Sequence, residues 1–133
     1  MKLQANPRHW AARWLPVAAW MGFIQYASVR TVVEIGPETL PQADKLLHAL
    51  AYALLALLIV RALRAAAALA LGDVALAAFA WATAFGALQE MLQHFIPKRS
   101  CDLLDLLSNG LGAGLAVLAW YLPRHGIVRI PPP

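Results

Sequence analysis

Four long runs of apolar residues dominate the chain, and short polar stretches separate them. Each run has close to the ~20 residues that an α-helix needs to cross ~30 Å of hydrocarbon. Helix breakers such as Pro41 and Pro97 lie between the runs. The pattern predicts an all-α fold, an integral membrane bundle of four transmembrane helices. The predicted helices cover residues 10–28, 46–63, 74–96 and 103–122.

The ends of the runs predict the domain limits. We expect one transmembrane domain over residues 10–122, flanked by polar tails at 1–9 and 123–133, of which the second is rich in proline. Gly72 and Asp73 come just before the third run. Because Asp is a favoured N-cap residue, Asp73 is expected to cap the third helix.

The composition separates this chain from soluble proteins. Its 133 residues are 61% hydrophobic and 14% charged, with a mean hydropathy of +0.60, whereas a soluble domain has roughly 25% charged residues. So short a chain cannot bury that much apolar surface within itself, so a lipid bilayer is the expected partner. The net charge of +4 would suggest nucleic acid in a soluble protein. Here the basic residues lie near the ends of the runs, and no nucleic-acid partner is expected.

The distribution of Lys and Arg predicts the orientation. Seven of these residues belong to the two terminal regions and to the stretch between the second and third runs, whereas four lie in the other two stretches. Because Lys and Arg are enriched on the cytoplasmic side of membrane proteins, both termini are predicted to be cytoplasmic. The first run is expected to stay uncleaved, since residues 25–28 make a poor signal-peptide cleavage site.

Polar side chains recur at helical spacing in three of the predicted helices, at the same depth and toward the external face. An ionisable side chain at the centre of a bilayer costs ~2.5–3.5 kcal/mol on the lower estimates, so these stripes are expected to face one another. Together they predict one polar site. Its candidate residues are Asp44, Lys45, His48, Tyr52, Glu90, Gln93, Arg99, Asp102, Asp105 and Asn109.

Residue types alone leave several uses of this site open. The stripes can hold the helices together, bind a head group or phosphate, bind a metal, or relay protons through Glu90 and Asp105. Arg99 carries a planar donor fork suited to phosphate, and Lys45 adds a second cation. No serine or cysteine of the chain lies in a setting that indicates a catalytic nucleophile.

The metal alternative depends on two carboxylate–imidazole pairs. Asp44 with His48, and Glu90 with His94, are each spaced one helical turn apart. Lys45 and Arg99 would compete for the carboxylates, and the HExxH pattern is absent. We therefore expect neither a metal nor a cofactor.

The order and spacing of these residues resemble the VanZ-like family of small bacterial membrane proteins, over about residues 40 to 118. The resemblance implies a bacterial inner (cytoplasmic) membrane location. The family's named member is associated with low-level resistance to the glycopeptide teicoplanin, and the resemblance assigns no catalytic residue. The motif that carries it is Asp44-Lys45-x2-His48-x3-Tyr52, then Glu90-x2-Gln93, then Pro97-x-Arg99-x2-Asp102-x2-Asp105-x3-Asn109-x2-Gly112.

The expected function is recognition of an anionic envelope lipid or cell-wall precursor at the outer membrane face. Arg99 and Lys45 would bind the anion, and Asp105 and Glu90 would orient these cations and His48. One alternative is an enzyme acting on an envelope lipid or phosphate, in some forms metal-dependent. Another is a structural or accessory subunit. A small-residue face at Gly110 and Gly114 also predicts a homo-oligomer.

Overall fold

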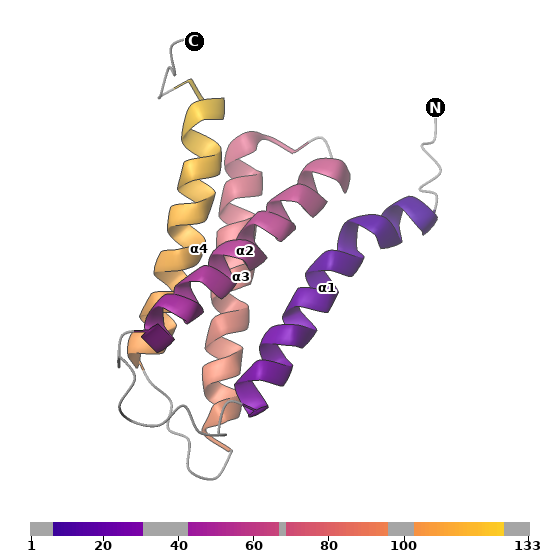
Figure 1. The fold of residues 1–133 in the computed structure, drawn as a ribbon. Helices are drawn as coiled ribbons and strands as arrows, with labels where there is room; N and C mark the ends of the chain where they lie inside the picture. Colours follow the sequence, from indigo (N-terminus) through magenta and orange to yellow (C-terminus); the bar gives the residue numbers. More distant parts are fainter. Residues whose placement is uncertain (1–6, 31–42, 67–68, 96–102, 127–133) are drawn as a thin grey trace.

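The computed structural model describes residues 7–30, 43–66, 69–95 and 103–126. These residues form four helices and no strand (Figure 1). The all-α prediction is therefore confirmed for the described part of the chain. The helices are α1 Pro7–Arg30, α2 Ala43–Ala66, α3 Leu71–Gln93 and α4 Leu103–Arg124.

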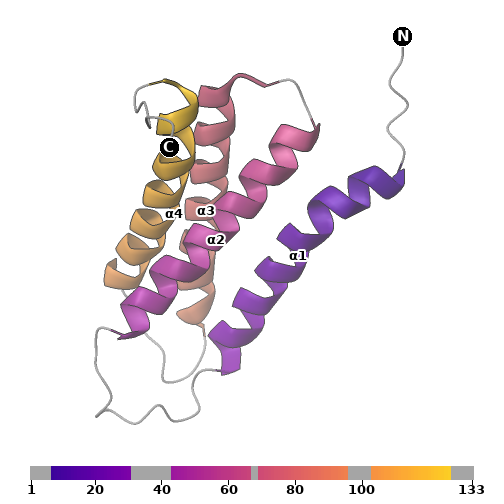
Figure 2. The ribbon, with the colours of Figure 1, turned by 45° about the horizontal axis from the view of Figure 1, so that its top comes forward.

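Consecutive helices run in opposite directions, so the starts of α2 and α4 share one end of the bundle with the ends of α1 and α3 (Figure 1). α2 packs most extensively against α4, and α3 packs against both. α1 lies along the outer side of α2, with a smaller contact to α3 and none to α4 among the described residues (Figure 2). The molecule is thus a three-helix unit with α1 packed on one side.

Three of the four helices are long and apolar enough to cross a membrane. They are α2 over Asp44–Ala65, α3 over Leu71–Gln93 and α4 over Leu103–Arg124. The prediction of membrane-spanning helices is confirmed for these three in length and composition. α1 is also 24 residues long, but it contains Pro16 and does not belong to this set. Its role as a fourth span, and the cytoplasmic position of the termini, stay predictions.

Small side chains form much of the core, and most of the large apolar side chains lie outside it. Leu55 and Ile59 are buried, together with five alanines of α2, α3 and α4. Large exposed side chains such as Leu76, Leu111 and Leu115 cover the outer surface, as expected of helices that face lipid. The buried alanines, which let the helices approach closely, are Ala56, Ala62, Ala78, Ala82 and Ala113.

A close helix contact involves Gly112 on α4. A Cβ atom at this position would clash with the backbone of Ala49 on α2. Only a residue without a side chain therefore permits this spacing between α2 and α4. The contact lies one turn beyond Asn109 and so sets the distance across which the polar residues meet.

The predicted cap of α3 is wrong. The helix begins at Leu71, Ala70 is in the N-cap position without a side-chain cap hydrogen bond, and the Val74 amide donates to the Ala70 carbonyl (3.1 Å). Asp73 lies inside the first turn, where its carboxylate is near the positive end of the helix dipole. Gly72 also lies inside the first turn and does not stop the helix.

Candidate functional site

Two polar contacts join α2 to α4 where both helices begin. Lys45 Nζ lies 2.7 Å from Asp105 Oδ1, and His48 Nδ1 lies 3.1 Å from Asn109 Oδ1. Asp105 and Asn109 are one turn apart on α4, and Lys45 and His48 are about one turn apart on α2, so two successive turns face each other. We call these four residues, together with Asp44, the polar cluster.

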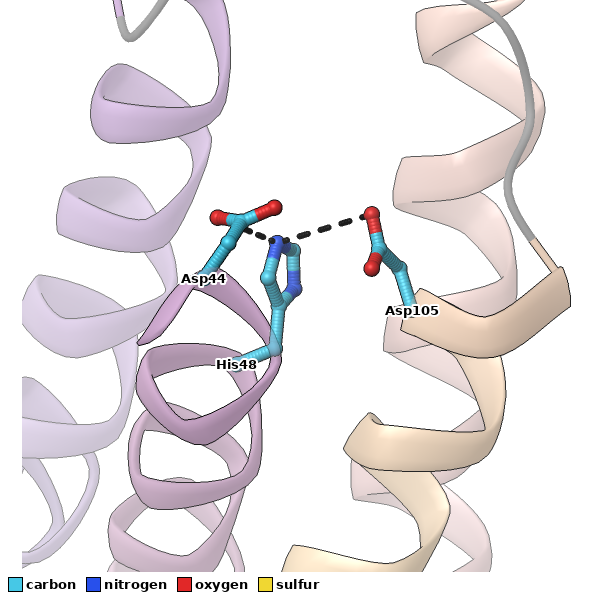
Figure 3. A group of neighbouring side chains, drawn as sticks. All are labelled: Asp44, His48 and Asp105. Atoms are coloured by element: carbon cyan, nitrogen blue, oxygen red, sulfur yellow. Dashed lines mark ion pairs between the residues drawn. The ribbon is translucent and has the colours of Figure 1, made fainter. Parts of the chain in front are cut away.

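His48 stands between two carboxylates, Asp44 from its own helix and Asp105 from α4 (Figure 3). Its Nε2 atom lies 3.7 Å from Asp44 Oδ1 and 3.9 Å from Asp105 Oδ2. An amide oxygen only accepts, so His48 Nδ1 donates to Asn109. The other ring nitrogen, Nε2, faces the two carboxylates. A cation held by the carboxylates would therefore also meet this nitrogen.

A metal ion would find three ligand atoms here. One atom each from Asp44, His48 and Asp105 lie within 4.8 Å of one another. Lys45 already holds Asp105 at 2.7 Å and competes with a metal for that carboxylate. The second predicted carboxylate–imidazole pair does not form, because Glu90 is buried whereas His94 is exposed beyond the last residue of α3.

Deeper in the bundle, Tyr52 and Asn109 meet beside Gly86 of α3. Both side chains are almost fully buried. A Cβ at Gly86 would lie 3.1 Å from Tyr52 Cε1 and 3.1 Å from Asn109 Nδ2, so the glycine leaves room for both. Asn109 Nδ2 is buried and finds no hydrogen-bond partner among the described residues. Glu90, buried on α3, is near enough for its charge to act on the Tyr52 phenol.

The end of α1 makes polar contacts with α3 that the sequence reasoning missed. Gln89 Nε2 donates to Gln25 Oε1 (2.7 Å), and Gln93 Nε2 donates to Ser28 Oγ (2.6 Å). Gln93 was a predicted site residue, and its partner lies on α1 rather than on α2 or α4. The available signal was the pair Gln25 and Ser28, polar residues three apart in an otherwise apolar run. Nearer the middle of α1, Trp20 Nε1 donates to a backbone carbonyl of α2 (2.9 Å).

The structure thus places the predicted residues in two groups. Asp44, Lys45, His48, Asp105 and Asn109 come together as the polar cluster, and Tyr52, Glu90 and Gln93 are buried close to this end of the bundle. Arg99, Asp102 and Pro97 lie outside the described residues. Within the single chain, Gly110 and Gly114 lie toward Thr83 and Phe79 of α3. The predicted homo-oligomer stays a prediction.

Comparison with known proteins identifies a family. The model described as VanZ/LLP1 matches residues 2–124. This range contains all four helices and every candidate site residue. No curated protein and no solved structure matches the chain.

Proposed function

The chain belongs to the VanZ/LLP1 family, and from this premise we propose that it recognises an anionic component of the bacterial envelope. The component carries a phosphate, as a lipid head group or a cell-wall precursor does. The observation that carries the proposal is the Lys45–Asp105 pair, with Nζ and Oδ1 2.7 Å apart at the mouth of the helix bundle.

The pair gives Lys45 a fixed place from which an anion can be bound. About a third of its side chain is exposed (32%), whereas the Asp105 side chain is 12% exposed and lies beneath it. A positioned ammonium loses less freedom on binding than a mobile one. His48 adds a polar ring, and Arg99, shortly before α4 in sequence, supplies a guanidinium.

The proposed setting is the external face of the bacterial cytoplasmic membrane, in a multi-pass protein with four spans. The Lys and Arg distribution supports cytoplasmic termini, which puts the polar cluster outside. The bonds from α1 to α2 and α3 support α1 as the fourth span. Cys101, between α3 and α4 in sequence, tests this: an impermeant maleimide should label it in intact cells. Labelling only after lysis would contradict the orientation.

Native mass spectrometry of the purified protein tests the recognition. The probes are phosphatidylglycerol and a polyprenyl phosphate, and the variants are Lys45→Gln and the charge-conserving Lys45→Arg. We expect phosphate-bearing adducts on the wild type, one bound equivalent of which is about fivefold weaker in Lys45→Gln and retained in Lys45→Arg. Arg13→Gln, which removes a cation from α1, is the matched control. Equal binding by wild type and Lys45→Gln would overturn the proposal.

A second candidate function is a metal-dependent enzyme acting on an envelope phosphate. The observation that favours it is the trio of ligand atoms from Asp44, His48 and Asp105. A divalent ion held there would polarise a phosphoryl oxygen. This candidate requires that added Mn²⁺ shifts the mass of the wild type and that His48→Gln abolishes the shift. It also requires release of phosphate from the envelope substrate. A third outcome is that neither ligand nor metal binds the wild type and that the variants lose stability. This outcome would indicate an accessory, structural role instead.

A further inference from the structure

The opposite end of the bundle carries an open pocket of about 600 Å³ between α2 and α4. Its walls include Leu57 and Val60 of α2 and Trp120 of α4, and three arginines surround it. We propose that this pocket, the basic pocket, binds the phosphate of an anionic phospholipid head group. Its arginines are Arg61, Arg64 and Arg124.

The arginines have no carboxylate partner in the part of the chain that the structure describes. Arg124 is fixed, because Nη1 donates to the Trp120 carbonyl (2.7 Å) and Cζ lies 5.2 Å from the centre of the Trp120 ring. Arg64 makes a long contact to the Leu69 carbonyl (3.4 Å). Arg61 forms no hydrogen bond or ion pair with the described residues. Three guanidinium groups around one pocket repel one another, and an anion between them removes that repulsion.

Among the residues that the structure describes, no acidic side chain pairs with the arginines of the pocket. Asp73 lies in the first turn of α3, at the same end of the bundle, but it is exposed and pairs with none of the three arginines. The His125 ring packs on Tyr121, with centroids 5.0 Å apart, and does not line the pocket. The described residues around the pocket therefore give a local excess of positive charge.

The chemistry of the walls favours a lipid over a free phosphate. On α2, Leu57 lies about one turn before Arg61 and Val60 lies directly before it. An apolar wall therefore continues from the arginines toward the membrane interior. A head group can sit among the guanidinium groups while its acyl chains lie against this wall. Trp120 suits the boundary, because indole rings concentrate at the membrane–water interface. Basic pockets between transmembrane helices are established sites for anionic head groups.

The basic pocket shares no residue with the polar cluster and lies at the other end of the bundle. The two proposals can therefore fail independently. With the termini in the cytoplasm, the basic pocket faces the cytoplasmic leaflet, where anionic lipids attract basic residues.

The test is native mass spectrometry of the full chain in a nonionic detergent. The probes are dioleoyl phosphatidylglycerol and the zwitterionic dioleoyl phosphatidylcholine, and the variants are Arg61→Gln, Arg61→Lys and Arg13→Gln. Arg61 suits the test because its loss removes no hydrogen bond within the described residues. We expect phosphatidylglycerol to bind the wild type about tenfold more tightly than phosphatidylcholine. In the Lys45→Gln background, Arg61→Gln should weaken phosphatidylglycerol binding about fivefold, while Arg61→Lys and the control Arg13→Gln leave it close to that of the background protein.

Two further measurements complete the test. One distinguishes a lipid phosphate from free phosphate, and the other distinguishes binding at the basic pocket from binding at the polar cluster. Excess inorganic phosphate should leave the phosphatidylglycerol adduct in place, and its displacement would overturn the assignment to a lipid. Lipid titrations in a Lys45→Gln background isolate the basic pocket, because this substitution weakens the proposed external site. Phosphatidylglycerol binding that falls in Lys45→Gln and is unchanged in Arg61→Gln would overturn the basic pocket while supporting the external site.

Discussion

Both ends of the bundle carry charged side chains, but the two ends use them differently. In the polar cluster, cation and carboxylate meet across a helix interface, as Lys45 Nζ and Asp105 Oδ1 do at 2.7 Å. At the basic pocket, Arg61, Arg64 and Arg124 surround an open space without a carboxylate partner in the described chain. The first arrangement joins helices, and the second leaves charge available to something outside the protein.

The difference shows why the number of charges alone does not identify a site. Much of the free energy of a paired charge comes from its partner, so its replacement changes helix packing as well as binding. An unpaired charge at the bundle surface contributes little to packing, so its replacement reports binding almost alone. The two ends therefore call for different experiments, and stability measurements should separate them.

The largest expected effect comes from the close contact between Gly112 on α4 and Ala49 on α2. Gly112→Ala would push its Cβ into the Ala49 backbone, and we expect it to reduce the free energy of unfolding by about 3 kcal/mol. Gly110→Ala is the matched control two residues earlier, where a Cβ would meet only Thr83 Cγ2 at 3.9 Å. That variant should lose no stability, because alanine favours helix over glycine. Unfolding in detergent followed by circular dichroism measures both, and equal stabilities would contradict the close α2–α4 approach.

A smaller loss should follow when the ion pair of the polar cluster is broken. Asp105→Asn removes the Asp105 carboxylate charge from the pair with Lys45, and we expect a cost of about 1–2 kcal/mol, moderated because the Lys45 side chain is 32% exposed. Asp73→Asn is the control, an exposed carboxylate without an ion pair in the described chain. The double variant Lys45→Met, Asp105→Leu should lose less than the sum of its single variants. Strict additivity would show that the two groups do not interact.

The smallest effects are expected at the basic pocket. Arg61→Gln should change the free energy of unfolding by less than about 0.5 kcal/mol, since no packing or bonding within the described residues depends on it. Arg124→Gln should cost about 0.5–1 kcal/mol, because it removes the bond to the Trp120 carbonyl and the contact with its ring. The same unfolding measurement applies. If Arg61→Gln reduced the free energy of unfolding as much as Asp105→Asn, the proposed difference between the two ends would be wrong.

Much of the polar cluster could be predicted from the sequence, because charge in an apolar helix is costly and must find a partner. Asp44 with His48, and Asp105 with Asn109, are each spaced one turn apart, and helical periodicity alone brings them to common faces. The length of the apolar runs similarly predicted the helices. The helix ends differ from the predicted ends by up to three residues, and α3 begins at Leu71, before Asp73.

The remaining contacts depended on packing that no single helix reveals. His94 follows Glu90 at helical spacing, but α3 ends at Gln93, and the side chain beyond that end is exposed rather than on the buried face. Gln25 and Ser28 carry no charge, so burying them costs less free energy than burying Asp or Lys. Their positions therefore indicated a polar contact less clearly. Their pairing with Gln89 and Gln93 requires knowing that α1 packs beside α3.

Gly112 also bears on how divergent members of this family should be compared. It contributes no side chain to the polar cluster, and it only allows α2 and α4 to lie at the distance across which that cluster assembles. Homologues that bind unrelated molecules would inherit the same glycine for as long as they keep this helix spacing. We therefore expect a glycine at this position to follow the helix spacing alone, whereas the proposed chemistry depends on the side chains at 45, 48, 105 and 109.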